Sequence, residues 1–156
     1  MQAMELMINP VLCTPSTSAR KVATMMKQFD VGVVLVVENL INRKLVGVIT
    51  DRDLILRLPA DRAPDKMAVE ECMTHGDLLC CKPDDNIEQI LDVMAKRHVR
   101  RVPVLSQGNK VEGIISDRVL LNYAVENAPE LCLALAHVIA SKTRRPDDID
   151  AGISFP

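Results

Sequence analysis

The chain has few aromatic side chains, and this limits what it can bind. Its 156 residues include no Trp, one Tyr and two Phe, or 2% aromatics, whereas 48% of the residues are hydrophobic. We therefore expect an aliphatic, Met-rich core. Binding of single-stranded nucleic acid generally uses bases stacked on aromatic rings, so nucleic acid is not an expected partner. The net charge of −2 likewise provides no general attraction for DNA or an acidic membrane.

The sequence also lacks long apolar runs and a regular cysteine framework. No apolar stretch reaches the roughly 18 residues that a membrane-spanning helix requires. The N-terminus has no basic start followed by an apolar block, as a signal peptide would. The five cysteines form an odd set without C-x-x-C spacing, which favours a reducing compartment over a disulfide framework. We therefore predict a cytoplasmic protein that does not associate with membranes.

The most informative feature that is present is an internal repeat. Residues 11–58 and 78–124 share one plan: a short strand ending at a proline, an amphipathic helix, an apolar strand, a turn, and a second strand that leads into a helix. The second copy is two residues shorter in its hairpin. Two such copies can bury their apolar faces against each other and form a cleft between them.

Capping residues and apolar periodicity place the helices. Ser18 and Asn86 are expected to cap the first helix of each copy, with Gln89 closing a capping box in the second. The closing helix is expected to begin at Thr50 in the first copy and at Ser116 in the second. Two further helices are expected over residues 69–73 and 130–142.

The strands and the boundaries follow from the same pattern. Val31–Val37 and Val99–Leu105 are predicted strands, and Pro103 implies that the second one lies at an edge or that the strand starts there. The predicted organisation is a first repeat over 4–58, a linker over 59–70, a second repeat over 71–124, a C-terminal helix over 129–142 and a loose tail over 143–156.

The turn between the second strand and the closing helix is the first candidate site. Residues 47–53 lead to a helix N-terminus, where free N–H groups and the helix dipole favour an anion or a polar ligand. Spacing alone makes Thr50 and Asp53 a capping box. A functional alternative is that the Asp53 carboxylate binds vicinal ribose hydroxyls. Val119 replaces this acid in the second copy, so we expect unequal sites, with the first the better one.

A basic run is the second candidate site. Residues 96–101 carry four cations where a helix leads into a buried strand. A solvated surface is the simple interpretation. Because Arg100 and Arg101 directly precede the apolar part of the strand, they are also candidates for bidentate binding of phosphate. Arg52 and Arg118, next to the two helix starts, would add positive charge.

Metal binding and catalysis have weaker support. Cys72, His75, Cys80 and Cys81 are close in sequence and suit zinc or a redox response, but their spacing matches no common zinc motif. Cys81 also matches Cys13 in the repeat, which indicates a small strand residue. The sequence contains no G-x-S-x-G, Walker A or H-E-x-x-H motif. We therefore expect neither a metal nor catalytic activity.

Taken in order, these features resemble a tandem pair of CBS domains, also called a Bateman module. The resemblance covers residues 4–123 and rests on two copies of the strand-Pro-helix opening, the helix-to-strand step and the Gly-x-x-Thr/Ser-Asp-Arg ending. Residues 99–104 are also similar to the second repeat of small stand-alone prokaryotic CBS-pair proteins. The resemblance implies a mixed α/β (α+β) fold of two β-α-β-β-α repeats around a pseudo-twofold axis, and a homodimer of such pairs.

The resemblance also implies a ligand. CBS pairs commonly bind adenosine-containing molecules, such as AMP, ADP, ATP or S-adenosylmethionine, in clefts between the repeats. By position, Thr50 and Asp53 would hold the ribose, and Arg52, Arg100 and Arg101 are the phosphate candidates. The residues that would flank the adenine are Cys13, Thr14, Val33 and Val34, and those kept in the second cleft are Ser116 and Asp117.

Two functions therefore remain open. The first is a non-catalytic regulatory module, in which the ligand bridges the repeats and changes the dimer geometry or the affinity for a downstream protein of unknown identity. The second is a ligand-free dimerisation or interaction module, in which Thr50 and Asp53 only cap a helix and the last helix supports assembly.

Overall fold

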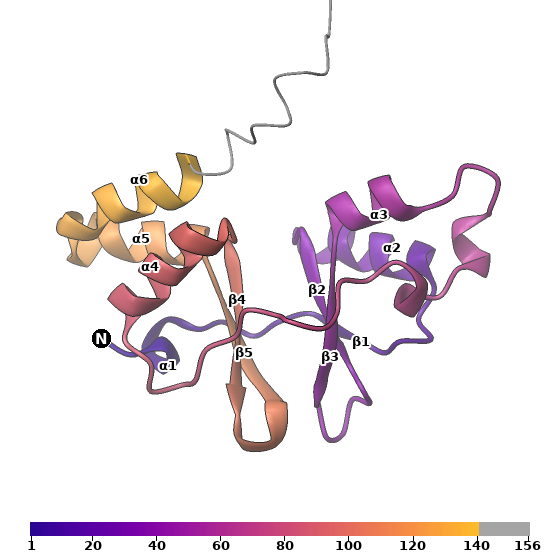
Figure 1. The fold of residues 1–156 in the computed structure, drawn as a ribbon, viewed down its shortest axis with the longest axis horizontal. Coiled ribbons are helices and arrows are strands. Elements are labelled where there is room, and N and C mark those ends of the chain that lie inside the picture. Colours follow the sequence, from indigo (N-terminus) through magenta and orange to yellow (C-terminus); the bar gives the residue numbers. More distant parts are fainter. Residues whose placement is uncertain (141–156) are drawn as a thin grey trace, which may run out of the picture.

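The chain folds into two similar halves that lie side by side, each with a small sheet and helices on one side of it (Figure 1). The computed structural model describes residues 1–140. The first half contains β1 (Leu12–Cys13), α2 (Ala19–Phe29), β2 (Val33–Val37), β3 (Leu45–Thr50) and α3 (Asp51–Arg57). The second contains α4 (Ile87–Arg97), β4 (Arg101–Ser106), β5 (Lys110–Ser116), α5 (Asp117–Asn127) and α6 (Cys132–Ala140). A short α1 (Ala3–Leu6) precedes both, and 3₁₀ turns include Pro64–Lys66, Val69–Glu71 and Pro129–Leu131.

The sheets confirm the predicted α+β fold of two repeats. In the first half, β1 is parallel to β2 and β2 is antiparallel to β3, while β4 and β5 form an antiparallel pair in the second. The second-half counterpart of β1 is a single bridge between Cys81 and Val104. The two sheets meet in a shared apolar cluster of Leu35, Val37, Val111 and Ile114, which joins the halves.

The predicted side-chain caps of α2 and α4 form, but the capping box predicted for α4 does not. Ser18 accepts a hydrogen bond from the Lys21 N–H, and Asn86 accepts one from the Glu88 N–H. The capping box predicted for Gln89 is wrong, because Asn86 bonds the second residue of α4 and no return bond from Gln89 is formed within residues 1–140. Asn86 alone supplies the side-chain cap of α4.

Both inner strands start two residues later than predicted. Asp30 and His98 end α2 and α4 in the left-handed conformation, with φ of 51° and 53°. The N–H groups of the following valines, Val31 and Val99, then bond back to carbonyls of the helices. These two residues close the helix ends and are not free to join the sheets.

Pro103 lies inside β4, so the strand does not start there. The other alternative expected from the sequence, an edge strand, is confirmed, because β4 and β5 form a two-stranded sheet. The Pro103 carbonyl accepts a bond from the Cys81 N–H, on the side of β4 that faces away from β5. A residue's N and C=O point to the same side of a strand, so the missing N–H of Pro103 also falls on this outer side. The β4–β5 ladder therefore loses no hydrogen bond.

Each half is completed by a segment that precedes the other repeat. Residues 1–8 pack on the second half, where Ile8 pairs with Ile114, and residues 67–74 pack on the first, where Thr74 pairs with Val48. The N-terminal residues 4–8, placed in the first repeat by sequence, thus complete the core of the second. This crossing brings Ile8 and the residues after it to the boundary between the halves.

The predicted C-terminal helix is present, beginning as a 3₁₀ turn at Pro129–Leu131 and continuing as α6. Its Leu135 and Val138 are buried against α4 and α5. The end of the predicted helix at residue 142 and the predicted loose tail lie outside the described residues. Within residues 1–140, no helix has the length and apolar character to cross a membrane.

Candidate functional site

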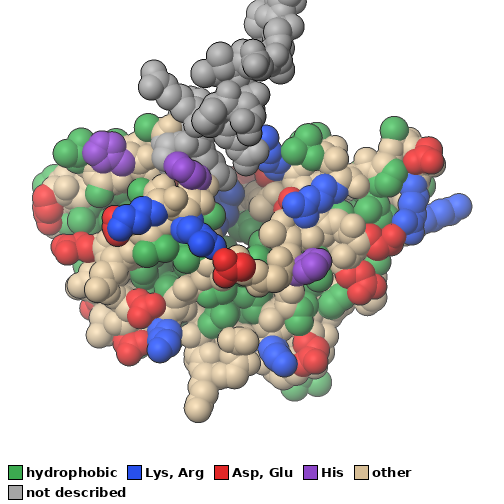
Figure 2. Space-filling view, viewed as in Figure 1, with side chains coloured by type: hydrophobic (Ala, Val, Ile, Leu, Met, Phe, Trp, Pro, Cys, Tyr) green, Lys and Arg blue, Asp and Glu red, His purple; other side chains and the backbone are tan. Residues whose placement is uncertain are grey.

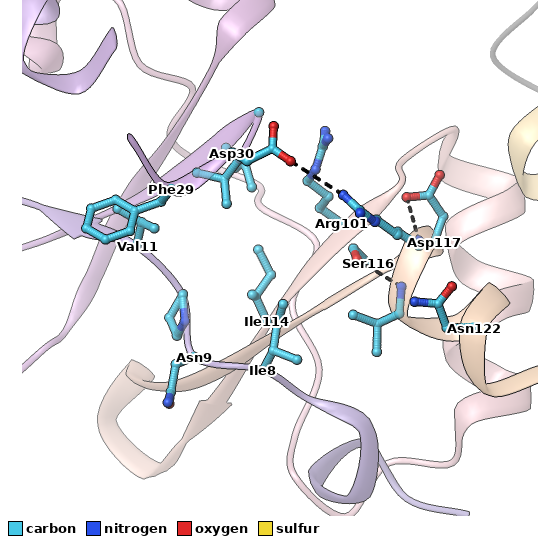
Figure 3. Close-up of a pocket in the computed structure, with 16 residues that line it drawn as sticks. Ile8, Asn9, Val11, Phe29, Asp30, Arg101, Ile114, Ser116, Asp117 and Asn122 are labelled. Carbon is cyan, nitrogen blue, oxygen red and sulfur yellow. Dashed lines mark hydrogen bonds and ion pairs between the residues drawn. The ribbon is translucent and has the colours of Figure 1, made fainter. Parts of the chain in front are cut away.

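A cavity lies between the two repeats (Figure 3). Its volume is about 370 Å³, within the range of roughly 300–1,000 Å³ that is usual for small-molecule sites. Apolar walls come from both halves, with Ile8, Val11, Val31, Val33 and Ile114 among them. Arg101, Ser116, Asp117 and Asn122 of the second half line one end of the cavity, and the polar residues Asn9 and Asp30 line other parts of it. The cavity thus combines apolar walls with a polar end.

A smaller cavity of about 140 Å³ lies at the first repeat's equivalent position. It is lined by Val48 and Thr50, which correspond to Ile114 and Ser116 in the larger cavity, and by Arg100 and Arg101. At this volume it does not reach the usual size of a small-molecule site. The sequence favoured this first cleft, whereas the structure gives more space to the second.

Thr50 and Asp53 form the capping box that their spacing predicts. The Thr50 hydroxyl accepts from the Asp53 N–H at 3.1 Å, and one Asp53 oxygen accepts from the Thr50 N–H at 3.0 Å and from the Thr50 hydroxyl at 2.9 Å. The other oxygen lies 3.4 Å from an Arg57 nitrogen and 3.5 Å from the Thr74 hydroxyl. The carboxylate is therefore occupied by protein partners, and Asp53 lines neither cavity.

The equivalent turn of the second repeat has a buried carboxylate in place of a capping box. Ser116 caps α5 by accepting from the Val119 N–H at 3.3 Å. The Asp117 side chain is buried, accepts from the Arg118 N–H at 3.0 Å and is hydrogen-bonded by Arg100 Nε. Val119 lines the cavity but offers no oxygen to a ribose. The polar groups of this turn face the larger cavity.

The four arginines singled out by sequence have different surroundings. Arg100 is held by Asp117, and Arg118 lies 3.8 Å from the exposed carboxylate of Asp30. Arg52 is exposed and lines neither cavity. Arg101 is half-buried and lines both cavities, and it has no ion-pair or hydrogen-bond partner among residues 1–140. Arg101 is therefore the cation most available to an anionic ligand.

The residues expected to flank an adenine divide into two groups. Val33 lines both cavities. Cys13 and Val34 are instead buried in the core of the first half, and Thr14 turns toward Thr17, with its N–H 3.1 Å from the Thr17 hydroxyl. Burial raises the pKa of the Cys13 thiol to about 12. Of these four, only Val33 meets the cavities.

The Cys72–Cys81 cluster is not brought together by the fold. Cys72 belongs to the core of the first half and Cys81 to that of the second. Burial raises the pKa of both thiols, to about 12 for Cys81. Among the residues that the structure describes, no group of three or more His, Cys, Asp and Glu side chains is placed to hold a metal.

Sequence reasoning missed one wall of the larger cavity. Residues 8–11 and 29–32 line it, although neither segment carries a chemical motif. The only signal was the repeat itself, because Phe29 and Asp30 occupy the positions that Arg97 and His98 hold in the basic run of the second copy.

Comparisons with known proteins agree with this architecture. The CBS domain profile matches residues 3–60 and 69–126. The chain belongs to the CBS-domain family. YlbB of Bacillus subtilis (strain 168) is 33% identical over 104 residues, which are 67% of this chain and 68% of YlbB.

Two solved structures show the same fold. The CBS domain pair of protein MJ0100, in complex with 5′-methylthioadenosine and S-adenosyl-L-methionine, superposes with a TM-score of 0.70 at 20% identity and covers 81% of this chain and 97% of its own. The CBS domain protein TA0289 from Thermoplasma acidophilum has a TM-score of 0.75 at 18% identity and covers 93% of this chain and 78% of its own.

Proposed function

We propose that this CBS pair is a non-catalytic regulatory module that binds an adenosine-containing ligand, such as AMP, ADP, ATP or S-adenosylmethionine, in the larger cavity between its repeats. The observation that carries the proposal is a cavity of about 370 Å³ with apolar walls from both halves and the unpaired Arg101 at its polar end. Apolar walls suit a purine, and a free guanidinium suits a phosphate. The complex of MJ0100 with two adenosine derivatives supports this ligand class.

Regulation follows from the position of the ligand. A molecule in this cavity contacts Val31 and Val33 of the first repeat and Ile114 and Ser116 of the second, so its binding energy depends on how the halves are arranged. A ligand shifts an equilibrium only when it binds one arrangement more tightly. The output is then a change in dimer geometry or in affinity for a downstream protein.

A thermal-shift series with AMP, ADP, ATP, S-adenosylmethionine and NAD tests the proposal. A ligand at about 100 times its Kd stabilises the folded state by about 2.7 kcal/mol, which raises Tm by about 5–10 °C in a chain of this size. Arg101→Met should reduce the shift with the phosphate-bearing ligands to about half or less, and Arg20→Met, at an exposed position, should keep it. No shift with any of the five would overturn the proposal.

The variant Asp53→Asn tests which of the two clefts binds the ligand. Because Asp53 lines neither cavity and serves as a cap, this variant should keep the nucleotide shift. Loss of the thermal shift in a folded Asp53→Asn variant would indicate that the ligand binds in the first cleft, as the sequence predicted.

We also propose a homodimer formed through α3 and α5, which is compatible with either function. Ile55 and Leu56 on α3 are 79% and 67% exposed, and Val125 on α5 is 67% exposed. Leu121, which matches Ile55 in the repeat, is also exposed. Apolar side chains repeated on equivalent helices suit a symmetric interface between two copies.

Light scattering after size-exclusion chromatography tests this interface. Ile55→Glu and Val125→Glu should convert dimers to monomers. Ile41→Glu is a matched control, because Ile41 is 94% exposed in the β2–β3 hairpin, away from both helices. A wild-type monomer, or dimers that survive both helix changes, would contradict the proposal.

A further inference from the structure

Val33 and Arg101 occupy equivalent positions in the two repeats. Each is the first residue of its strand and pairs with the last residue of the next strand, Val33 with Thr50 and Arg101 with Ser116. Both residues line both cavities. In a fully symmetric pair of repeats, these two positions would carry the same residue. Here one carries an aliphatic side chain and the other a guanidinium, so Arg101 is the one cation that this pair of positions offers to the two cavities.

The neighbouring cations do not replace Arg101. Arg100 lines only the smaller cavity and donates to Asp117. Arg118 lines only the larger cavity, with 78% of its side chain exposed and Asp30 at 3.8 Å. The Arg101 guanidinium also lies close to the first repeat. One of its nitrogens is 3.1 Å from the point where a Cβ on Gly32 would stand, and an Asp51 carboxylate oxygen is 3.0 Å from the same point. It therefore stands between the two repeats.

We infer that the two clefts compete for Arg101, so that the chain holds one anionic ligand at a time. This inference rests on the proposed function. A guanidinium forms its bidentate fork with one phosphate at a time. An anion in the larger cavity takes Arg101 from the smaller one. A small anion such as inorganic pyrophosphate, bound in the smaller cavity of about 140 Å³, does the reverse. Because coupling between sites is reciprocal, each ligand lowers the affinity for the other by the same factor.

Competition has a regulatory consequence. The larger cavity carries Val119 and the smaller adjoins the turn with Asp53, so the two clefts differ in the groups that they offer a ligand. Two anions that prefer different clefts would then displace each other without sharing a site. The chain would report the ratio of two anions instead of the concentration of one.

Isothermal titration calorimetry with ADP, and separately with inorganic pyrophosphate, tests the inference. The wild type should bind one ADP per chain, with any second site weaker by about tenfold or more, the scale of a typical coupling free energy. Arg101→Met should weaken the first site by about tenfold or more, with Arg20→Met as a folded control of equal charge change. Arg101→Lys, which keeps the charge but not the fork, should give an intermediate loss.

Val33→Arg provides the decisive variant, since it restores a cation to each repeat. It should raise the stoichiometry to two anions per chain, provided that its circular dichroism matches the wild type. Two equal and independent ADP sites in the wild type would overturn the inference while leaving the proposed function intact. Unchanged ADP affinity in Arg101→Met would overturn the inference and the role of Arg101 as the phosphate ligand, but not binding of the ligand in the cavity. A wild type that binds neither ADP nor pyrophosphate, nor S-adenosylmethionine, would overturn both. If Val33→Arg does not fold, the wild-type stoichiometry and the two Arg101 variants decide.

Discussion

Met7 packs directly on the backbone of Gly113. A Cβ added to Gly113 would lie 2.8 Å from the Met7 Cβ and 2.7 Å from its sulfur. Real Cβ contacts are not this short, and the Met7 Cβ cannot move away without its backbone. The pseudo-twofold axis repeats the contact, with the Met73 sulfur 2.6 Å from an added Cβ on Gly47. The two glycines thus let the crossing segments approach the central strands.

The first prediction follows from this contact. Gly113→Ala should lower the free energy of unfolding by about 1–3 kcal/mol, the usual cost of overpacking. In a Met7→Ala background the same change should cost less, because the contacts with the Met7 sulfur and Cγ are removed and only the contact with the Cβ stays. Urea denaturation of the four proteins in this double-mutant cycle measures the coupling. Equal costs in both backgrounds would contradict the contact.

The Arg100–Asp117 pair gives the second prediction. Asp117 is the only buried charged or polar residue in the part of the chain that the structure describes, and Arg100 donates to it. Arg100→Met should cost about 1–2 kcal/mol of stability, a value discounted because 41% of the Arg100 side chain is exposed. Arg118→Met, which removes only the exposed pair with Asp30, should cost about 0.5 kcal/mol or less. Equal costs for the two changes in urea denaturation would show that the Arg100 pair adds nothing.

The missing acid of the second repeat gives the third prediction. Val119→Asp places a carboxylate three residues after Ser116, as Asp53 follows Thr50, and should close a second capping box worth about 0.5–1 kcal/mol. In the larger cavity the new carboxylate should also tighten binding of ADP but not of its 2′,3′-dideoxy analogue, because only ADP offers ribose hydroxyls. Calorimetry with both ligands measures this difference. Equal changes for the two ligands would place the ribose elsewhere.

The buried thiols give the fourth prediction. With a pKa of about 12 for both Cys13 and Cys81, about one thiol in ten thousand is ionised at pH 8. Iodoacetamide should therefore leave both unlabelled in the folded protein, and labelling should rise about tenfold for each pH unit below 12. Mass spectrometry of peptides from native and denatured protein measures this, and the denatured chain should label at all five cysteines. Rapid native labelling of Cys13 at pH 8 would contradict its burial.

The sequence by itself determined the repeat, the order of the elements and most helix starts. Ser18, Asn86, Thr50 and Ser116 each cap the helix that they were expected to cap. These features are local, since a cap bonds an N–H two or three residues away and an amphipathic helix shows its own period. The same local rules also identified Thr50 and Asp53 as a capping box, which the structure contains.

The tertiary structure alone decided which cleft is spacious and which arginine is free. Ile8 reaches the larger cavity because it pairs with Ile114, more than a hundred residues later in the chain. Arg100 and Arg101 are neighbours in sequence, yet one is tied to Asp117 and the other lines both cavities. Successive residues of a strand point to opposite faces, and their partners come from distant segments. The spacing of residues along the chain does not specify those partners. The residues that line the site therefore follow only from the packing of the two halves.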